Sequence, residues 1–288
     1  MSSWPKIPQS ALGPLALGSL LIILAALFAG GRTTTRFAPN SAVQLPAGVE
    51  RPMPPGATPT PWPLSGNYTG QMGMLRLAVA EGLLDPQAQE ALVADLDQAL
   101  AYVVQRTALA PQSPLDIYVG LEPGCGLHGI AYTDVRRVQV FTCPTLPLNR
   151  AVNILAHEFV HQLCHDRYGD RHLQADLVLA EGIATWGAGR YWLGDAPHFR
   201  AFVAPWLRQG EELPLGISYV GLPISDMNKL YYQWASFVEY LIETYGREAF
   251  DALYVTGQGQ PGSADYVGIY GRTFGELEAA WKAWVLQG

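Results

Sequence analysis

The longest apolar run of the chain lies close to its N-terminus, where residues 11–31 carry no charged side chain. About 20 apolar residues are enough for a helix to cross the roughly 30 Å hydrocarbon core of a bilayer. The apolar region of a cleaved signal peptide is shorter, about 7 to 15 residues, and ends in a small-residue cleavage site. We therefore expect an uncleaved transmembrane signal anchor over residues 11–31, after a polar tail at residues 1–10. A cleaved signal peptide is the alternative.

Residues 32–66 differ sharply in composition from the run before them, because proline, threonine and small residues dominate. Prolines lack a backbone N–H donor, so they block helices and the interior of sheets. Proline-rich segments of this kind are semi-extended spacers. We expect residues 32–66 to be a linker that holds a folded domain, residues 67–288, away from a membrane.

The apolar positions of the domain first predict one helix and then a small sheet. Apolar residues recur at helical spacing over residues 75–109, which favours a helix there. Residues 115–121 are typical of a strand, and residues 130–133 and 135–142 are typical of a hairpin. The sheet is therefore expected to be small and mixed or antiparallel.

The second half of the domain shows mainly helical patterns. Helices are expected at residues 173–193, 197–207, 227–245 and 249–255. A last helix is expected to begin at Thr273, because a Glu follows three residues later at Glu276 and completes a capping box. A small sheet followed by a mainly helical half is an α+β fold.

Composition and charge exclude some classes of function. The 288 residues are 49% hydrophobic and 15% charged, which is ample for a large folded domain. The formal net charge is −7 and the few lysines are scattered, so no basic cluster is present. Proteins that bind nucleic acid carry such a cluster, so we expect no nucleic-acid partner.

The sequence Ala-His-Glu-Phe-Val-His ends at His161 and carries the strongest chemical signal in the chain. His157 and His161 are four residues apart, so on a helix they lie on one face, one turn above the other. Two imidazoles at this spacing can reach one metal ion. Glu158 can then reach a water molecule bound to that ion, which is the arrangement of a zinc-dependent hydrolase. We expect one Zn²⁺ ion as cofactor.

A catalytic zinc ion needs a third protein ligand. Glu181 is the best candidate, because the nineteen residues between it and His161 allow the chain to leave the first helix and return on a second. Small residues after Glu181 permit close packing of that second helix on the first. His172 and Asp176 are alternative third ligands.

Three blocks of the sequence resemble the glutamate zincins (gluzincins), and within them the peptidase MA-like metallopeptidases. The blocks are the His-Glu-x-x-His motif, the Glu-Gly-x-Ala motif that begins at Glu181, and a Tyr-x-Gln block in which Gln233 follows Tyr231. The resemblance covers roughly residues 70–288. It implies a zincin-like domain in which Tyr231 binds the oxyanion of the reaction, with Tyr232 as the alternative.

The resemblance carries two further implications. In these zincins the last strand before the metal helix is an edge strand, which pairs with the extended backbone of a substrate. An ordinary sheet edge protected by arginines is the other interpretation of residues 135–142. Some zincins also place an acid one turn after the third ligand to orient a metal-bound His, whereas this chain has Thr185 there.

These observations predict a zinc peptidase in which Glu158 is the general base and a peptide or protein is the substrate. The apolar N-terminal segment predicts a membrane-anchored protein whose catalytic domain lies outside the cytoplasm, or a secreted one if the segment is cleaved. The alternative function is a catalytically silent, membrane-tethered binding module with a zincin fold.

Three cysteines fit an extracytoplasmic location, where disulfides form. Cys125 and Cys143 bracket the predicted hairpin, so we expect them to pair; a Cys143–Cys164 bond is the alternative. Cys164 shares the helix face of the two histidines. A thiolate there would be a fourth protein ligand and would close the site to water, which suits a structural zinc ion rather than a catalytic one.

Overall fold

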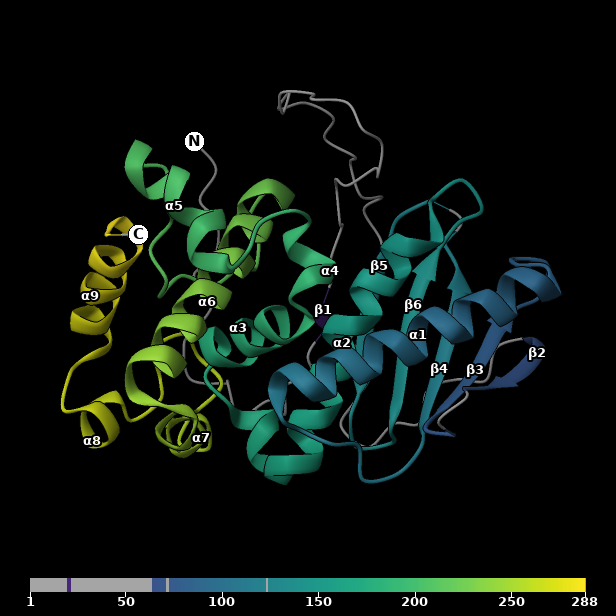
Figure 1. Cartoon of the computed structure of the whole chain (residues 1–288), viewed down its shortest axis with the longest axis horizontal. Coiled ribbons are helices and arrows are strands. Elements are labelled where there is room, and N and C mark those ends of the chain that lie inside the picture. The colour runs from purple at the N-terminus through teal and green to yellow at the C-terminus, as the bar shows by residue number, and fades with distance from the viewer. Residues whose placement is uncertain (1–19, 22–63, 71–72, 123, 288) are drawn as a thin grey trace, which may run out of the picture.

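The computed structural model describes residues 20–21, 64–70, 73–122 and 124–287. A twisted sheet forms one half of the domain and a group of helices forms the other (Figure 1). Helices α1 (Pro86–Thr107) and α2 (Leu148–Tyr168) lie across one face of the sheet, and α2 also contacts α3 (Leu177–Ala188) from the helical half. The metal-binding motif lies on α2, where the two halves meet.

The sheet is mixed, as expected. Its strands are β1 (Leu20–Leu21), β2 (Leu64–Thr69), β3 (Leu75–Ala80), β4 (Leu115–Leu121), β5 (His128–Tyr132) and β6 (Arg137–Thr142). Their order across the sheet is β1-β5-β6-β4-β3-β2. The β3–β4 and β4–β6 pairs are parallel, and the remaining pairs are antiparallel. The strand at residues 115–121 and the hairpin are therefore confirmed.

The single helix expected at residues 75–109 is wrong, because its first six residues form β3 and the helix α1 spans Pro86–Thr107. Leu75 and Leu77 are buried in alternation with Arg76, which is the period of a strand. The helix begins only where the Asp85 side chain accepts a hydrogen bond from the backbone N–H of Ala88, so the cap sets the boundary.

The expectation that the last strand before the metal helix is an edge strand is also wrong. That strand is β6, and it lies between β4 and β5. The chain leaves β4, skips one position to form β5, and returns as β6 to fill the gap. On this side of the sheet β5 lies outside β6, and the short strand β1 (Leu20–Leu21) forms the edge, paired with β5 in antiparallel register opposite Ile130 and Gly129.

The helical half contains α2 (Leu148–Tyr168), the 3₁₀ helix η1 (Gly169–Gln174), α3 (Leu177–Ala188), α4 (Arg190–Leu193), α5 (Phe199–Gln209), α6 (Ile224–Tyr245), α7 (Arg247–Tyr254), α8 (Tyr266–Tyr270) and α9 (Phe274–Leu286). The prediction of one helix over residues 173–193 is wrong. The helix is interrupted at Gly189, whose φ of 43° favours glycine. The capping box of Thr273 and Glu276 is confirmed at the start of α9.

Asp176 connects the start of α3 to the C-terminal part of the chain. Its side chain caps α3 by accepting from the backbone N–H of Val178 at 2.9 Å. It also accepts from the N–H groups of Gly262 and Ala264 and from the hydroxyl of Tyr266, at 3.0–3.1 Å. Four donors satisfy this fully buried carboxylate, so Asp176 is a structural residue.

The disulfide joins Cys125 to Cys143, with a Cα–Cα distance of 5.1 Å. This is the pairing that we expected, and the alternative with Cys164 does not form. Cys164 is a buried free thiol on α2. The bond closes the loop that contains β5 and β6.

The expected anchor at residues 11–31 lies outside the described residues except for Leu20–Leu21, and the tail at residues 1–10 lies entirely outside them. The linker at residues 32–66 is also outside them, apart from its last residues, which belong to β2. Within the described ranges, no helix is both long and apolar enough to cross a membrane. The two anchor residues that the structure describes, Leu20–Leu21, form strand β1 and not a helix, while the rest of the anchor and the linker stay predictions.

Candidate metal centre

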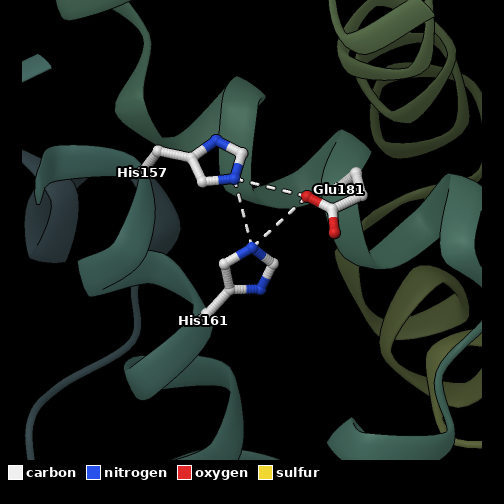
Figure 2. Close-up of side chains that lie close together, drawn as sticks. All are labelled: His157, His161 and Glu181. Carbon is white, nitrogen blue, oxygen red and sulfur yellow. Dashed lines mark hydrogen bonds and ion pairs between the residues drawn. The ribbon is translucent and has the colours of Figure 1, made fainter. Parts of the chain in front are cut away.

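The two histidines of the motif and Glu181 come together in the core of the domain. His157 and His161 lie on the same face of α2 and are fully buried, while Glu181 on α3 is 1% exposed. Figure 2 shows the two imidazoles and the carboxylate pointing at a common point between the helices. Of the His, Cys, Asp and Glu residues in the described ranges, these form the one group of three close enough to hold a metal ion.

The spacing of the three ligand atoms fits a four-coordinate zinc ion. The Nε2 atoms of His157 and His161 are 3.1 Å apart. The Oε2 atom of Glu181 is 3.3 Å from the first and 3.4 Å from the second. Ligands bound tetrahedrally at about 2.0–2.1 Å from zinc are themselves about 3.3–3.4 Å apart. One ion can therefore contact all three atoms with little rearrangement.

The protonation states at this site are also those that a metal requires. Burial lowers the pKa of His157 to about 4, although the Glu181 carboxylate opposes this shift. Burial raises the pKa of Glu181, but the two imidazoles outweigh it and lower that pKa to about 2. At neutral pH His157 is thus neutral and Glu181 is ionised, which are the forms that ligate zinc.

Close packing of α3 on α6 (Ile224–Tyr245) places Glu181. The next residue is Gly182, and a Cβ atom added there would lie 2.7 Å from the carbonyl oxygen of Trp234 and 2.7 Å from a methyl group of Val238. The two helices can approach to this distance only because the position carries no side chain. The small residue after Glu181 therefore sets the position of the carboxylate.

Thr185 occupies the place of the acid that some zincins use to orient a ligand. Its hydroxyl oxygen lies 3.3 Å from Nδ1 of His157. If Nδ1 carries the proton, its N–H donates a hydrogen bond to the Thr185 hydroxyl oxygen. The lone pair of Nε2 then faces the metal position. By contrast, Nδ1 of His161 is buried with no hydrogen-bond partner in the part of the chain that the structure describes.

Glu158 is fully buried beside the three ligands and faces strand β5. Neither carboxylate oxygen has a full hydrogen-bond partner among the described residues. Burial raises its pKa well above the usual value and the Glu181 carboxylate adds to this, while the backbone of Ala131 partly opposes them. A Cβ added at Gly129 would come within 3.1 Å of Oε1, so the glycine makes room for this side chain. The carboxylate is well suited to take up a proton.

The two tyrosines of the third block point in different directions. Tyr231 is 1% exposed, and its ring centroid lies 5.9 Å from that of His157. Its hydroxyl has no full hydrogen-bond partner among the residues described. The hydroxyl of Tyr232 instead donates to the carbonyl oxygen of Trp192 at 2.9 Å. Tyr231 is therefore the tyrosine that faces the metal position.

The alternative ligands have other partners. His172 makes a 2.8 Å hydrogen bond between its Nδ1 and the hydroxyl of Tyr254. Asp176 is occupied by its four donors, as described above. Burial raises the pKa of Cys164 to about 12, so this group stays a thiol and is a poor metal ligand.

Two aromatic residues near the site were not predicted from the sequence. Trp192, just after α3, has its ring centroid 5.3 Å from that of His157 and stacks on Tyr231 at 6.3 Å. Tyr219, on the segment before α6, lies 5.8 Å from Tyr231. Neither belongs to a motif, and both reach the site only through the packing of distant segments.

The sequence matches no family model and no curated protein. Among solved structures it is similar to an M1 zinc metallopeptidase from Deinococcus radiodurans, with 20% identity and a TM-score of 0.41. It is also similar to a point mutant of that enzyme, with 18% identity and a TM-score of 0.39. Each likeness covers 77% of this chain and 51% of the other, so this chain spans about half the length of the structures it matches. Likenesses of this size do not establish a family.

Proposed function

We propose that this chain is a zinc-dependent peptidase whose single Zn²⁺ ion is held by His157, His161 and Glu181. One observation carries the proposal: three ligand atoms from two helices lie 3.1–3.4 Å apart in the core, beside the buried carboxylate of Glu158. A structural zinc ion normally has four protein ligands. Three ligands converge among the described residues, which leaves one position for water and substrate.

Glu158 is the proposed general base. When bound, zinc supplies Lewis acidity, which lowers the pKa of a water molecule and polarises a carbonyl group. The Glu158 carboxylate accepts a proton from the attacking water and then gives it to the leaving amine.

Tyr231 is the proposed donor to the oxygen that gains negative charge. Burial raises the pKa of Tyr231 well above its usual value, and the Glu181 carboxylate adds to this shift. The phenol therefore keeps its proton at neutral pH. The hydroxyl lies beside the neutral phenol of Tyr219 and makes no bond to a charged group among the described residues, so it can turn to donate to an oxyanion.

The substrate class that fits the site is an extended peptide. Strand β5 has an outer edge, and residues Leu20–Leu21 pair along it in antiparallel register. A substrate backbone in the place of Leu20–Leu21 would lie opposite Gly129, where a Cβ atom would come within 3.1 Å of Oε1 of Glu158. Adding a strand to a sheet edge is a common way to hold a peptide.

We further propose that the domain lies outside the cytoplasm, held to a membrane by residues 11–31. The Cys125–Cys143 disulfide supports this location, because such bonds persist mainly in oxidising compartments. The anchor itself rests on the apolar composition of residues 11–31.

The proposal is tested by incubating the full-length protein with a mixed peptide library and identifying new termini by mass spectrometry. We expect cleavage that a zinc chelator abolishes and that added Zn²⁺ restores. A protein that binds one zinc ion but cleaves no peptide would instead support the binding module. Cleavage that persists at full rate without metal would remove the zinc mechanism.

A further inference from the structure

Tyr219 lies on the segment between α5 (Phe199–Gln209) and α6 (Ile224–Tyr245) and brings a second phenol to the metal centre. Its side chain is half-buried, whereas the next residue, Val220, is 78% exposed. Its ring lies 5.8 Å from Tyr231 and 6.2 Å from Trp234. Tyr219 therefore reaches from the surface to the tyrosine that faces the metal position.

The first part of this segment is fixed to the helical half. The side-chain amide of Gln233 donates to the carbonyl oxygen of Leu213 and accepts from its N–H, at 2.7 and 3.0 Å. The indole of Trp234 donates to the carbonyl oxygen of Leu215 at 2.9 Å. These bonds fix the position of Leu213 and Leu215 relative to α6, and so determine where the segment passes the metal centre.

The following residues form a short tip that carries Tyr219. Its backbone hydrogen bonds are local: the N–H of Leu222 donates to Tyr219, and the N–H of Val220 donates to the Ser218 hydroxyl. Glycines flank the tip at Gly216 and Gly221, and the φ of Gly221 is 84°. Residues 213–215 are held by α6, and residues 218–222 are held by their own local hydrogen bonds. Together they place the phenol of Tyr219 beside Tyr231.

The two phenols form a pair in a site with two carboxylates. Burial raises the pKa of Tyr219, and the Glu181 and Glu158 carboxylates raise it further. The hydroxyl of Tyr231 lowers the pKa of Tyr219, while that of Tyr219 raises the pKa of Tyr231. Both groups are neutral at neutral pH, and their hydroxyls are close enough to affect one another.

We propose that Tyr219 is a positioning residue for Tyr231, holding the Tyr231 hydroxyl so that its proton points at the reacting carbonyl oxygen. The proposal rests on the proposed function and names a part of the same site. A phenol without a hydrogen-bond partner rotates freely about its C–O bond. Tyr219 supplies a second hydroxyl that restricts this rotation. When the Tyr231 proton turns to the carbonyl oxygen, Tyr219 donates its own proton to the Tyr231 oxygen, and a chain of two hydroxyls makes the inner one a stronger donor.

The test uses Tyr219→Phe, Tyr231→Phe and the double variant in the full-length protein, each loaded with zinc. We expect Tyr219→Phe to lower kcat about 3- to 10-fold, the size of one neutral hydrogen bond, with KM and zinc content unchanged. Tyr231→Phe should lower kcat more. The double variant should match Tyr231→Phe alone, because Tyr219 acts through Tyr231.

Val220→Ala is the matched control, since it alters an exposed side chain of the same tip without removing a phenol or a hydrogen bond of the tip. It should retain the wild-type kcat. A second readout is calorimetric binding of a phosphinic peptide, whose tetrahedral group imitates the transition state. Tyr219→Phe should weaken its binding by the same factor as kcat and leave binding of the plain product peptide unchanged.

If the kcat losses of the two single variants multiply in the double variant, the two tyrosines act independently and the positioning role is overturned. A Tyr219→Phe protein with wild-type kcat would also overturn it. Equal loss in Val220→Ala would assign the effect to the loop rather than to the phenol. A wild-type protein that cleaves no peptide would overturn the proposed function, and the positioning role with it.

Discussion

The side chain of Glu158 is surrounded by apolar atoms, by backbone and by another carboxylate, and this isolation determines its chemistry. A buried carboxylate that lacks hydrogen-bond donors is destabilised in its charged form. It gains stability when it accepts a proton. The same surroundings that make Glu158 costly for folding therefore make it effective in moving a proton.

Glu158→Gln should separate these two effects. We expect kcat to fall about 10²- to 10⁴-fold, the usual contribution of a general base. Zinc binding should persist, because the three ligand atoms belong to other residues. The melting temperature should not fall, since a neutral amide of the same shape replaces a buried charge. Activity assays, metal analysis and calorimetry check these points, and a full wild-type rate would remove Glu158 as base.

Thr185 is a second position where a single oxygen atom is expected to affect zinc affinity. Thr185→Val keeps the shape but removes the hydroxyl beside Nδ1 of His157. We expect zinc affinity to fall by about 10-fold, the lower end of the range for such supporting groups. Competition with a coloured chelator measures this affinity.

Thr185→Ser is the control, because it retains the hydroxyl and should bind zinc nearly as well as the wild-type chain. Equal losses in the Val and Ser variants would show that packing, rather than the hydrogen bond, supports His157.

At the scale of elements, the α3–α6 contact carries Glu181 into place. Gly182→Ala would ordinarily favour a helix, but its new methyl group would meet the backbone of Trp234 at 2.7 Å. We expect a loss of about 1–3 kcal/mol in the free energy of unfolding, together with weaker zinc binding as α3 shifts. Urea unfolding and metal titration measure the two effects.

Gly275→Ala is the matched control, since a Cβ atom at that helical position meets nothing within 4 Å. It should be neutral or slightly stabilising. If Gly182→Ala behaves in the same way, the close approach of the two helices does not depend on the glycine.

Sequence patterns predicted elements best where a single period and a clear cap coincide. The strand Leu115–Leu121 and the capped start of α9 were predicted at the observed positions. The strand β3 was missed because the helical pattern was extended back through the turn at residues 81–84, where Gly82 has a φ of 74° and separates β3 from the cap at Asp85. The place of β6 inside the sheet depends on pairing between distant strands, which no local pattern encodes.

The same division applies to the candidate site. His157 and His161 are four residues apart, so local helix geometry brings them together and the sequence predicts their juxtaposition. Glu181 needed one further assumption, that a second helix returns to the first. Tyr219 has no such local relation to the motif, and its position depends on hydrogen bonds between the loop and α6.

At the scale of the molecule, the metal position lies between the sheet half and the helical half. Both imidazoles come from α2, which packs on the sheet, and the carboxylate comes from α3 in the helical half. An ion bound by residues from both helices favours the folded state over the unfolded one. Without the ion, the buried side chains of His157, His161 and Glu181 face one another.

Zinc should therefore stabilise the whole domain. Free zinc at about 1,000 times its dissociation constant adds about 4 kcal/mol. For a domain of this size that corresponds to a rise in melting temperature of roughly 8–16 °C. Calorimetry with zinc and with chelator measures the shift, and Glu181→Ala should lose most of it. Equal melting temperatures in both conditions would contradict a site for zinc.

The four hydrogen bonds of Asp176 have a consequence for the C-terminal end of the chain. The groups that satisfy its carboxylate include Gly262, Ala264 and Tyr266, all far along the sequence from the histidines. Proteolytic trimming that removes this stretch would leave a buried charge with one of its four donors, the N–H of Val178, at the first turn of α3. The helix that carries Glu181 would then lose its anchorage, so a cut more than eighty residues away along the chain would abolish metal retention.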